Sequence, residues 1–400
     1  MSDALPEYPL EMYRSRYAKS KALMEEMNLD GLFISGEENI FYFTGVRIFN
    51  PWTSYPRPSF AVLPKNSEPI LLVQENHLLH AQLSSWIKDV RYYQELNGPP
   101  ATTIAQIVRD SGMQIGRIGA EIGYEQRINM PLAAFRQVEA ELHSDFLDAA
   151  ALLWRMRMIK SKEEIFSIRR ACEILGEAYS EAYQAVREGM TESELAASLR
   201  SAICKREAEK PAFLSMNTSS DLGQGSNSGK MVQHTRSLMT KPPSQRVLRK
   251  GDVVWIDSGA VYKGYNSDYS RMVVLGKPTE RQLRTYRLVQ RITRKCVEEM
   301  KPGVKCSEIV KVCNQELRLA GSNVTFDYGR IGHGVGLLLT EPPHIGSYDD
   351  TIIEPNMVLT IEPGIITDYG SFHLEENLLI TENGEPEVLS VSAETMKTGF

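Results

Sequence analysis

The first 150 residues alternate short apolar runs with stretches whose apolar positions recur at helical spacing. Residues 11–29 have this helical spacing, and the apolar run at residues 31–35 follows after the Asp30-Gly31 turn signal. Strand patterns and helix patterns then alternate, which is typical of an α/β domain. The expected strands are residues 31–35, 40–45, 60–64, 69–73 and 117–122, and the expected helices are residues 77–87 and 104–110.

The pattern changes near residue 150 to longer helices and paired strands. Residues 149–188 read as long helices, and Thr191 with Glu194 forms a capping box at the start of another helix. Strands are expected at 251–275 and again near the C-terminus, with a helical block at 279–319 between them. The prediction is an α+β protein of two domains: a smaller N-terminal α/β domain at residues 1–155 and a larger domain at residues 156–400.

Composition narrows the class of protein. The chain has 42% hydrophobic and 24% charged residues, as globular proteins do, and no apolar run of the roughly 20 residues that cross a bilayer. Its start lacks the apolar core of a signal peptide, and its five cysteines form no CxxC pair, so we expect reduced thiols and a cytoplasmic location. A net charge of −6 argues against nucleic acid as a partner. We expect neither nucleic-acid nor membrane partners.

Two pairs of acids lie symmetrically about turn sequences in the second half of the chain. Asp257 and Asp268 flank the turn at Tyr262-Lys263-Gly264, and Glu362 and Glu375 flank the turn at residues 368–370. Each stretch reads as two strands joined by a short loop. Folding each stretch about its midpoint places Asp257 opposite Asp268 and Glu362 opposite Glu375, about 5 Å apart and on one face.

Like charges placed so close together destabilise a fold unless a cation binds between them. With His333, in GRIGHGVGL, the set comprises four carboxylates and one imidazole. Such ligands suit two divalent ions, of Mn, Co, Fe or Zn, which can share and activate a water molecule. The predicted metal ligands are Asp257, Asp268, His333, Glu362 and Glu375, and Glu362 is also the expected general base.

These residues carry a resemblance to a known family. Asp257 and Asp268 in VWIDSGAVYKGYNSD, His333 in GHGVGL, Glu362 in TIEPG and Glu375 in LEEN resemble the five metal ligands of the pita-bread metalloenzymes. That family includes methionine aminopeptidase, Xaa-Pro aminopeptidase, prolidase and the metal-free creatinase. The resemblance covers about residues 155–390, and the N-terminal half resembles the domain that precedes the catalytic domain in prolidase and creatinase. It implies a pita-bread catalytic domain and a homodimer.

The chain departs from the proline-specific members of this family at three positions. Thr340 stands where those members have a histidine seven residues after the ligand histidine, and His373 stands where an arginine precedes the last glutamate by two positions. Thr240 falls about where a further family histidine lies, with His234 in the same segment. In the family these groups bind the scissile carbonyl or the substrate termini. Thr340 and His373 are therefore candidate substrate contacts whose chemistry differs from the family pattern.

A second resemblance points to small charged substrates. Ser54-Tyr55-Pro56-Arg57-Pro58 resembles a creatinase segment whose aromatic residue and arginine hold a substrate carboxylate in the neighbouring subunit. Carried over, Tyr55 and Arg57 would bind a carboxylate across a dimer, and Trp52 would add an aromatic wall for a cationic group. Two further candidate substrate contacts are His344, near the ligand loop, and Tyr265, beside Asp268.

The expected activity is hydrolysis of an amide-type C–N bond by metal-bound hydroxide, of the Xaa-Pro dipeptidase or aminopeptidase type, on short peptides or small molecules. One alternative is hydrolysis of a small zwitterion such as a creatine-like or ectoine-like compound. Another is a dimethylsulfoniopropionate lyase on the same metal site. A binding or scaffold protein built on an inactive peptidase fold is a fourth reading, which the five filled ligand positions disfavour.

Overall fold

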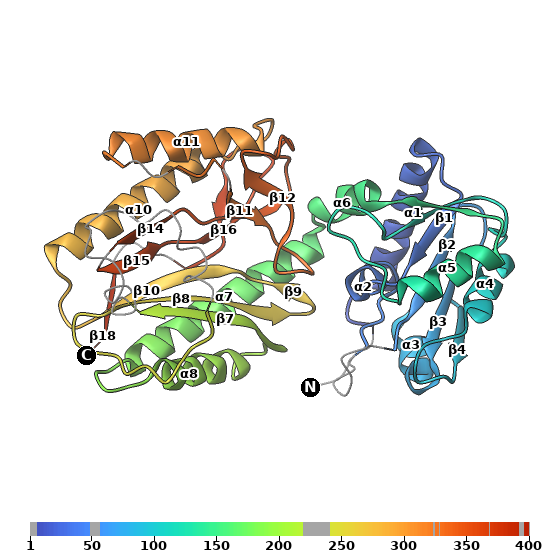
Figure 1. Cartoon of the computed structure of the whole chain (residues 1–400), viewed down its shortest axis with the longest axis horizontal. Coiled ribbons are helices and arrows are strands. Elements are labelled where there is room, and N and C mark those ends of the chain that lie inside the picture. Colours follow the sequence, from blue (N-terminus) through green and yellow to red (C-terminus); the bar gives the residue numbers. More distant parts are fainter. Residues whose placement is uncertain are drawn as a thin grey trace. The chain divides into compact units, whose positions relative to one another are not determined.

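A computed structural model describes residues 6–48, 57–218, 241–322, 325–327, 329–367, 369–391 and 396–399. The chain divides into two compact units, Met1–Arg157 and Met158–Phe400 (Figure 1). Within the described residues, no helix is both long enough and apolar enough to cross a membrane.

The first unit is built on a six-stranded mixed sheet, with strand order β4-β3-β2-β1-β5-β6 (Figure 1). Strand β2 runs antiparallel to both of its neighbours, and the remaining pairs are parallel. The strands are β1 Gly31–Ile34, β2 Phe60–Pro64, β3 Ile70–Gln74, β4 Asp89–Tyr93, β5 Arg117–Ala120 and β6 Asp145–Asp148. The helices are α1 Leu10–Glu26, α2 Glu37–Thr44, α3 Leu78–Ser84, α4 Ala101–Asp110, α5 Leu132–Glu141 and α6 Ala150–Met158, with the 3-10 turn η1 at Glu75–His77.

Four of the five strands expected in this unit are confirmed, and the one expected at residues 40–45 is wrong. Residues 40–45 were expected as a strand but belong to helix α2. Gly45 ends this helix in the left-handed conformation. Two acids in the first turn stabilise the helix, because their negative charges lie at the positive end of the helix dipole. Every residue from Asn39 to Thr44 is buried. A helix buried on all sides has a continuous apolar run, so its sequence resembles that of a buried strand.

The second unit places its sheets between two pairs of helices. Figure 1 shows α7 and α8 on one side of the strands and α10 and α11 on the other. The helices are α7 Lys162–Ala185, α8 Glu192–Cys204, α10 Glu280–Glu299 and α11 Cys306–Leu319. The strands are β7 Lys210–Thr218, β8 Val253–Tyr262, β9 Tyr265–Asn266, β10 Tyr269–Leu275, β11 Arg330–Gly334, β12 Glu341–Gly346, β13 Val358–Ile361, β14 Gly364–Thr367, β15 Gly370–His373, β16 Glu376–Leu379, β17 Glu387–Val388 and β18 Lys397–Gly399.

Two five-stranded sheets form the centre of this unit. One has the order β18-β10-β8-β7, with β9 paired to β8, and the other has the order β12-β11-β13-β16-β17. A core that includes Trp255, Ile292, Ile309 and Leu359 packs α10 and α11 against the strands. The expected capping box at Thr191 and Glu194 is confirmed at the start of α8.

Candidate metal centre

The hairpin of β8, β9 and β10 carries the two aspartates, but its register differs from the prediction. Tyr262 pairs with Tyr265 and Asp257 pairs with Ser270, so Asp257 does not lie opposite Asp268. The turn is the two residues Lys263-Gly264, both at positive φ, and not the three residues Tyr262–Gly264. The resulting shift is two residues. Because side chains alternate along a strand, a two-residue shift keeps both aspartates on the same face.

The register places Gly259 against the backbone just before Asp268. A β-carbon at Gly259 would lie 2.2 Å from the carbonyl oxygen of Ser267, so only glycine allows this approach.

Replacing Gly259 by alanine should destabilise the protein by about 1–3 kcal/mol and displace Asp268, because strand backbone would have to shift. Thermal unfolding and bound metal measure the two effects. An unchanged Tm with full metal content would contradict this close approach.

The second hairpin has the predicted register. Ile361 pairs with Glu376 in the β13–β16 ladder, and Gly364 pairs with His373 in the β14–β15 ladder. Glu362 and Glu375 therefore lie opposite each other in the short segments that connect the β13–β16 ladder to the β14–β15 ladder. This register confirms the predicted pairing of the two strands, with the turn between Thr367 and Gly370.

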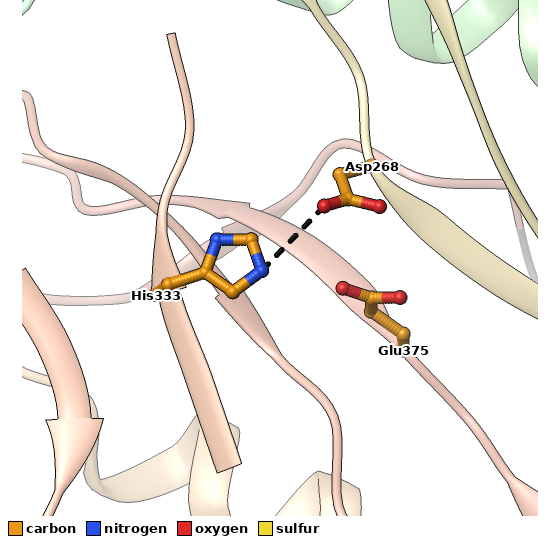
Figure 2. Close-up of side chains that lie close together, drawn as sticks. All are labelled: Asp268, His333 and Glu375. Carbon is orange, nitrogen blue, oxygen red and sulfur yellow. Dashed lines mark ion pairs between the residues drawn. The ribbon is translucent and has the colours of Figure 1, made fainter. Parts of the chain in front are cut away.

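Three of the five predicted ligands converge most closely. Figure 2 shows the His333 ring directed toward the carboxyl groups of Asp268 and Glu375. One ligand atom from each of these three buried residues lies within 4.8 Å of the other two. His333 Nε2 is 3.5 Å from Asp268 Oδ2 (Figure 2). These side chains come from the β9–β10 connection, β11 and the residues just before β16, so the site joins segments distant in sequence.

The other two acids adjoin this cluster. A hydrogen bond links the carboxyl groups of Asp257 and Glu375. Glu362 Oε1 lies 3.8 Å from His333 Nε2, and the Glu362 side chain is 21% exposed, against 4% for those of Asp268 and His333. Asp257 is likewise half-buried, whereas Asp268 and Glu375 are buried, so Glu362 and Asp257 are the acids of the group that retain some exposure to solvent.

Burial dominates the electrostatics of this site. It raises the pKa of Asp257 to about 8, with the nearby Glu362 charge adding to the effect. It also raises the pKa values of Asp268 and Glu375, whose carboxylate neighbours act in the same direction. Burial lowers the pKa of His333 to about 3, so its imidazole is neutral. Acids in such surroundings are stabilised in their charged form only if a cation joins them.

The donor atoms fit divalent metal ions. Within the described residues, one buried carboxylate oxygen each of Asp257, Asp268 and Glu375 has no hydrogen-bond partner. His333 Nδ1 donates to the carbonyl oxygen of Gly334 at 2.9 Å, which leaves the lone pair of Nε2 facing the acids. Oxygen ligands with one neutral imidazole are what hard or borderline divalent ions prefer.

Sequence reasoning missed the residue that holds the Asp268 backbone. Asn377 is fully buried, and its side chain accepts from the Asp268 amide at 2.9 Å and donates to the Asp268 carbonyl at 2.6 Å. Asn377 lies two residues after Glu375 in LEEN, so one short motif supplies a candidate ligand and positions another. Only the adjacency to Glu375 could have suggested this role.

Arg271 supports the same motif from strand β10. Its Nη1 donates to the Glu375 carbonyl at 2.7 Å, and its Nη2 contacts Glu376 Oε2 at 2.8 Å. The guanidinium lies over the Tyr269 ring, 4.7 Å from the ring centroid. Arg271 thereby fixes the backbone from which Glu375 projects.

The four candidate substrate contacts in the second unit have different partners within the protein. His373 Nε2 donates to the Glu362 carbonyl at 2.6 Å and is 3.5 Å from Glu362 Oε2, so His373 holds the predicted base in place. His344 pairs with His333 across β11 and β12. Thr340 Oγ1 lies 3.4 Å from Arg330 Nη2. The Tyr265 hydroxyl donates to Glu164 at 2.8 Å and is buried.

The candidates in the N-terminal half are only partly described. Tyr55 and Trp52 lie outside the described residues, as do Thr240 and His234. Arg57 is described and lies among the residues that line a small pocket with Ser35, Glu37 and Asn129.

Comparison with known proteins identifies the two halves separately. The metallopeptidase family M24 matches residues 167–382, which is more than half of the chain. The Creatinase/Prolidase N-terminal domain matches residues 16–159. Together they confirm the expected pita-bread metallopeptidase fold preceded by a creatinase-type domain.

Relatives match over nearly the whole chain. An Xaa-Pro dipeptidase of Pyrococcus furiosus is 29% identical over 96% of this chain and 100% of its own length. The crystal structure of the prolidase from Pyrococcus horikoshii superposes with a TM-score of 0.78 at 26% identity, covering 96% of this chain and 99% of that one. The X-Pro aminopeptidase from Thermotoga maritima gives a TM-score of 0.77 at 25% identity, covering 95% and 99%. The chain is thus a metallohydrolase and belongs to metallopeptidase family M24.

Proposed function

We propose that this protein is an Xaa-Pro dipeptidase that hydrolyses the bond preceding proline in short peptides. The observation that carries the proposal is the convergence of Asp268, His333 and Glu375 in a buried site with carboxylate oxygens that lack partners among the described residues. The Xaa-Pro dipeptidases that match over 96% of the chain support the substrate class.

The proposed cofactor is a pair of divalent ions, of Mn, Co, Fe or Zn, held by Asp257, Asp268, His333, Glu362 and Glu375. Four carboxylates with one imidazole provide more oxygen donors than one such ion needs. Bound ions would polarise the scissile carbonyl and make water a better nucleophile. The protein supplies the fixed geometry: Arg271 and Asn377 hold the backbones of Glu375 and Asp268.

Glu362 is the proposed general base. Its partly exposed carboxylate borders the buried cluster, and Oε1 is the atom placed to accept a proton from the attacking water. His373 keeps Glu362 in position through the 2.6 Å hydrogen bond to its carbonyl oxygen. A held carboxylate loses less conformational freedom when it meets the substrate, which favours catalysis.

We also propose a cytoplasmic homodimer. Two leucines one helical turn apart on α3, Leu79 and Leu83, are 69% and 57% exposed, and Tyr92 on the edge strand β4 is 48% exposed. Large apolar side chains on an edge of a sheet favour association with another chain. Light scattering after size-exclusion chromatography would measure the mass, and a monomer at micromolar concentration would contradict the dimer.

The other activities considered are not favoured by the relatives, which include Xaa-Pro dipeptidases and peptidases. The test is a substrate panel on metal-loaded protein: Xaa-Pro dipeptides, the same dipeptides with alanine in place of proline, creatine, ectoine and dimethylsulfoniopropionate. The proposal predicts turnover of Xaa-Pro dipeptides well above that of the alanine analogues. Turnover of only a small zwitterion would replace the dipeptidase proposal with the corresponding hydrolase or lyase.

A further inference from the structure

Arg330 lies at the edge of the metal centre, three residues before His333 on β11. Its guanidinium contacts include groups on three described residues: Nη1 is 3.2 Å from His344 Nδ1, Nη2 is 3.4 Å from Thr340 Oγ1, and Nε is 4.0 Å from Glu362 Oε1. Two of these partners come from β12 and the residue before it, and the third is the proposed base. The geometry therefore sets a permanent positive charge beside the accessible side of the carboxylate cluster.

Two other cations near the cluster differ from Arg330 in burial. The Arg271 side chain is 6% exposed and donates to Glu376 and to backbone carbonyls. The Lys160 side chain is 2% exposed and lies 3.7 Å from the buried Glu341. The Arg330 side chain is 33% exposed, and the adjacent Glu362 side chain is 21% exposed. Of these three cations, Arg330 is the one that a molecule entering from solvent can contact.

A substrate carboxylate that does not bind the proposed metal ions still lies near the partly exposed Glu362, so a positive charge beside that acid favours its binding. The neighbouring candidate contacts do not provide one: Thr340 has a neutral hydroxyl, and the His373 ring is buried against Glu362. A guanidinium offers a planar fork of N–H donors that matches both oxygens of a carboxylate. The accessible Arg330 has this chemistry at the required place.

We propose that Arg330 binds a carboxylate group of the substrate, an inference that rests on the proposed dipeptidase function. The carboxylate comes either from the C-terminus of the dipeptide or from an acidic side chain on its first residue. Both sources use the same charge-assisted contact, and substrates that lack one or the other distinguish them.

The test compares the metal-loaded wild-type protein with the variants Arg330→Met and Arg330→Lys. Arg294→Met is the matched control, because that arginine is 70% exposed on α10 and lies 3.9 Å from Glu298 at the surface. KM and kcat are measured for Leu-Pro, Leu-prolinamide, Glu-Pro and Gln-Pro, with metal content and Tm as checks on folding.

We expect Arg330→Met to raise KM by about tenfold to a hundredfold for substrates that carry the recognised carboxylate, Leu-Pro if it is the C-terminus and Glu-Pro if it is a side chain, with kcat changed far less, as loss of a charge-assisted hydrogen bond predicts. The KM of Arg330→Lys should lie between those of the wild type and of Arg330→Met, because a lysine ammonium keeps the positive charge but cannot make the two parallel hydrogen bonds of a guanidinium. If the C-terminal carboxylate is the partner, the variant should not change KM for Leu-prolinamide. If an acidic side chain is the partner, the loss should appear for Glu-Pro and not for Gln-Pro.

Equal losses on all four substrates, or no loss on any of them, would overturn the proposal. A binding measurement separates it from the proposed function. Calorimetric titration with proline and with prolinamide reports carboxylate recognition even if the wild-type protein hydrolyses no dipeptide. Proline binding that weakens in Arg330→Met while prolinamide binding does not would support the carboxylate contact. Unchanged proline binding, together with unchanged KM for Glu-Pro, would refute it.

Discussion

Replacing Asp268 by asparagine should lower peptidase activity by about a thousandfold or more and remove most of the bound metal. Metal polarisation contributes several kcal/mol to such reactions, and each 1.36 kcal/mol is a tenfold change in rate. The same substitution should stabilise the metal-free protein. Folding raises the pKa of Asp268, so the ionised carboxylate destabilises the fold at neutral pH, and asparagine removes that cost.

The size of the stabilisation follows from the cost of a buried, unbalanced charge. Removing it should contribute roughly 1–3 kcal/mol, or about 2–4 °C in Tm for each kcal/mol. The measurement is Tm after removal of metal with a chelator and again after its return. Asp350→Asn is a suitable control, since Asp350 is 67% exposed. A lower Tm for metal-free Asp268→Asn than for metal-free wild type would indicate a structural role and contradict the ligand assignment.

Replacing Glu362 by glutamine should lower kcat by about a hundredfold to ten-thousandfold, the range for loss of a general base. KM should change little, because the amide keeps the shape of the side chain. Some metal should remain, since the tighter cluster of Asp268, His333 and Glu375 is intact. Steady-state kinetics and metal analysis of the same samples measure both quantities.

Glu354→Gln serves as the control for this second substitution, because Glu354 is exposed and lies on the same segment of chain. Full activity in that control excludes a general effect of removing a negative charge. A Glu362→Gln protein that keeps wild-type kcat would show that another group accepts the proton.

The sequence allowed the candidate site to be predicted better than its local geometry. The acids lie in strands whose turns are marked by glycine, and the second hairpin has the predicted register around Glu362 and Glu375. The first hairpin was shifted by two residues, because Lys263 adopts positive φ and shortens the turn. A lysine in that conformation is uncommon, so the pattern of residues gave no sign of it.

Long-range contacts account for the remaining misses. Asn377 and Arg330 act through residues far away in sequence, and neither has a pattern that marks it. Lys160 is buried and lies 3.7 Å from the buried Glu341, a pairing that no local pattern indicates. Helix α2 was expected to be a strand because its apolar residues contact the protein on every side. Such features depend on tertiary packing, which local periodicity does not encode.

We propose that five side chains, on strands β8 and β11 and on residues adjoining β10, β13 and β16, form a centre for two metal ions. Metal analysis of protein purified without chelator, for the wild type and for Asp268→Asn side by side, tests it most directly. We predict close to two equivalents of a divalent transition metal per chain in the wild type and far less in the variant. Wild-type protein that takes up no divalent metal even after incubation with Mn, Co, Fe and Zn would contradict the account.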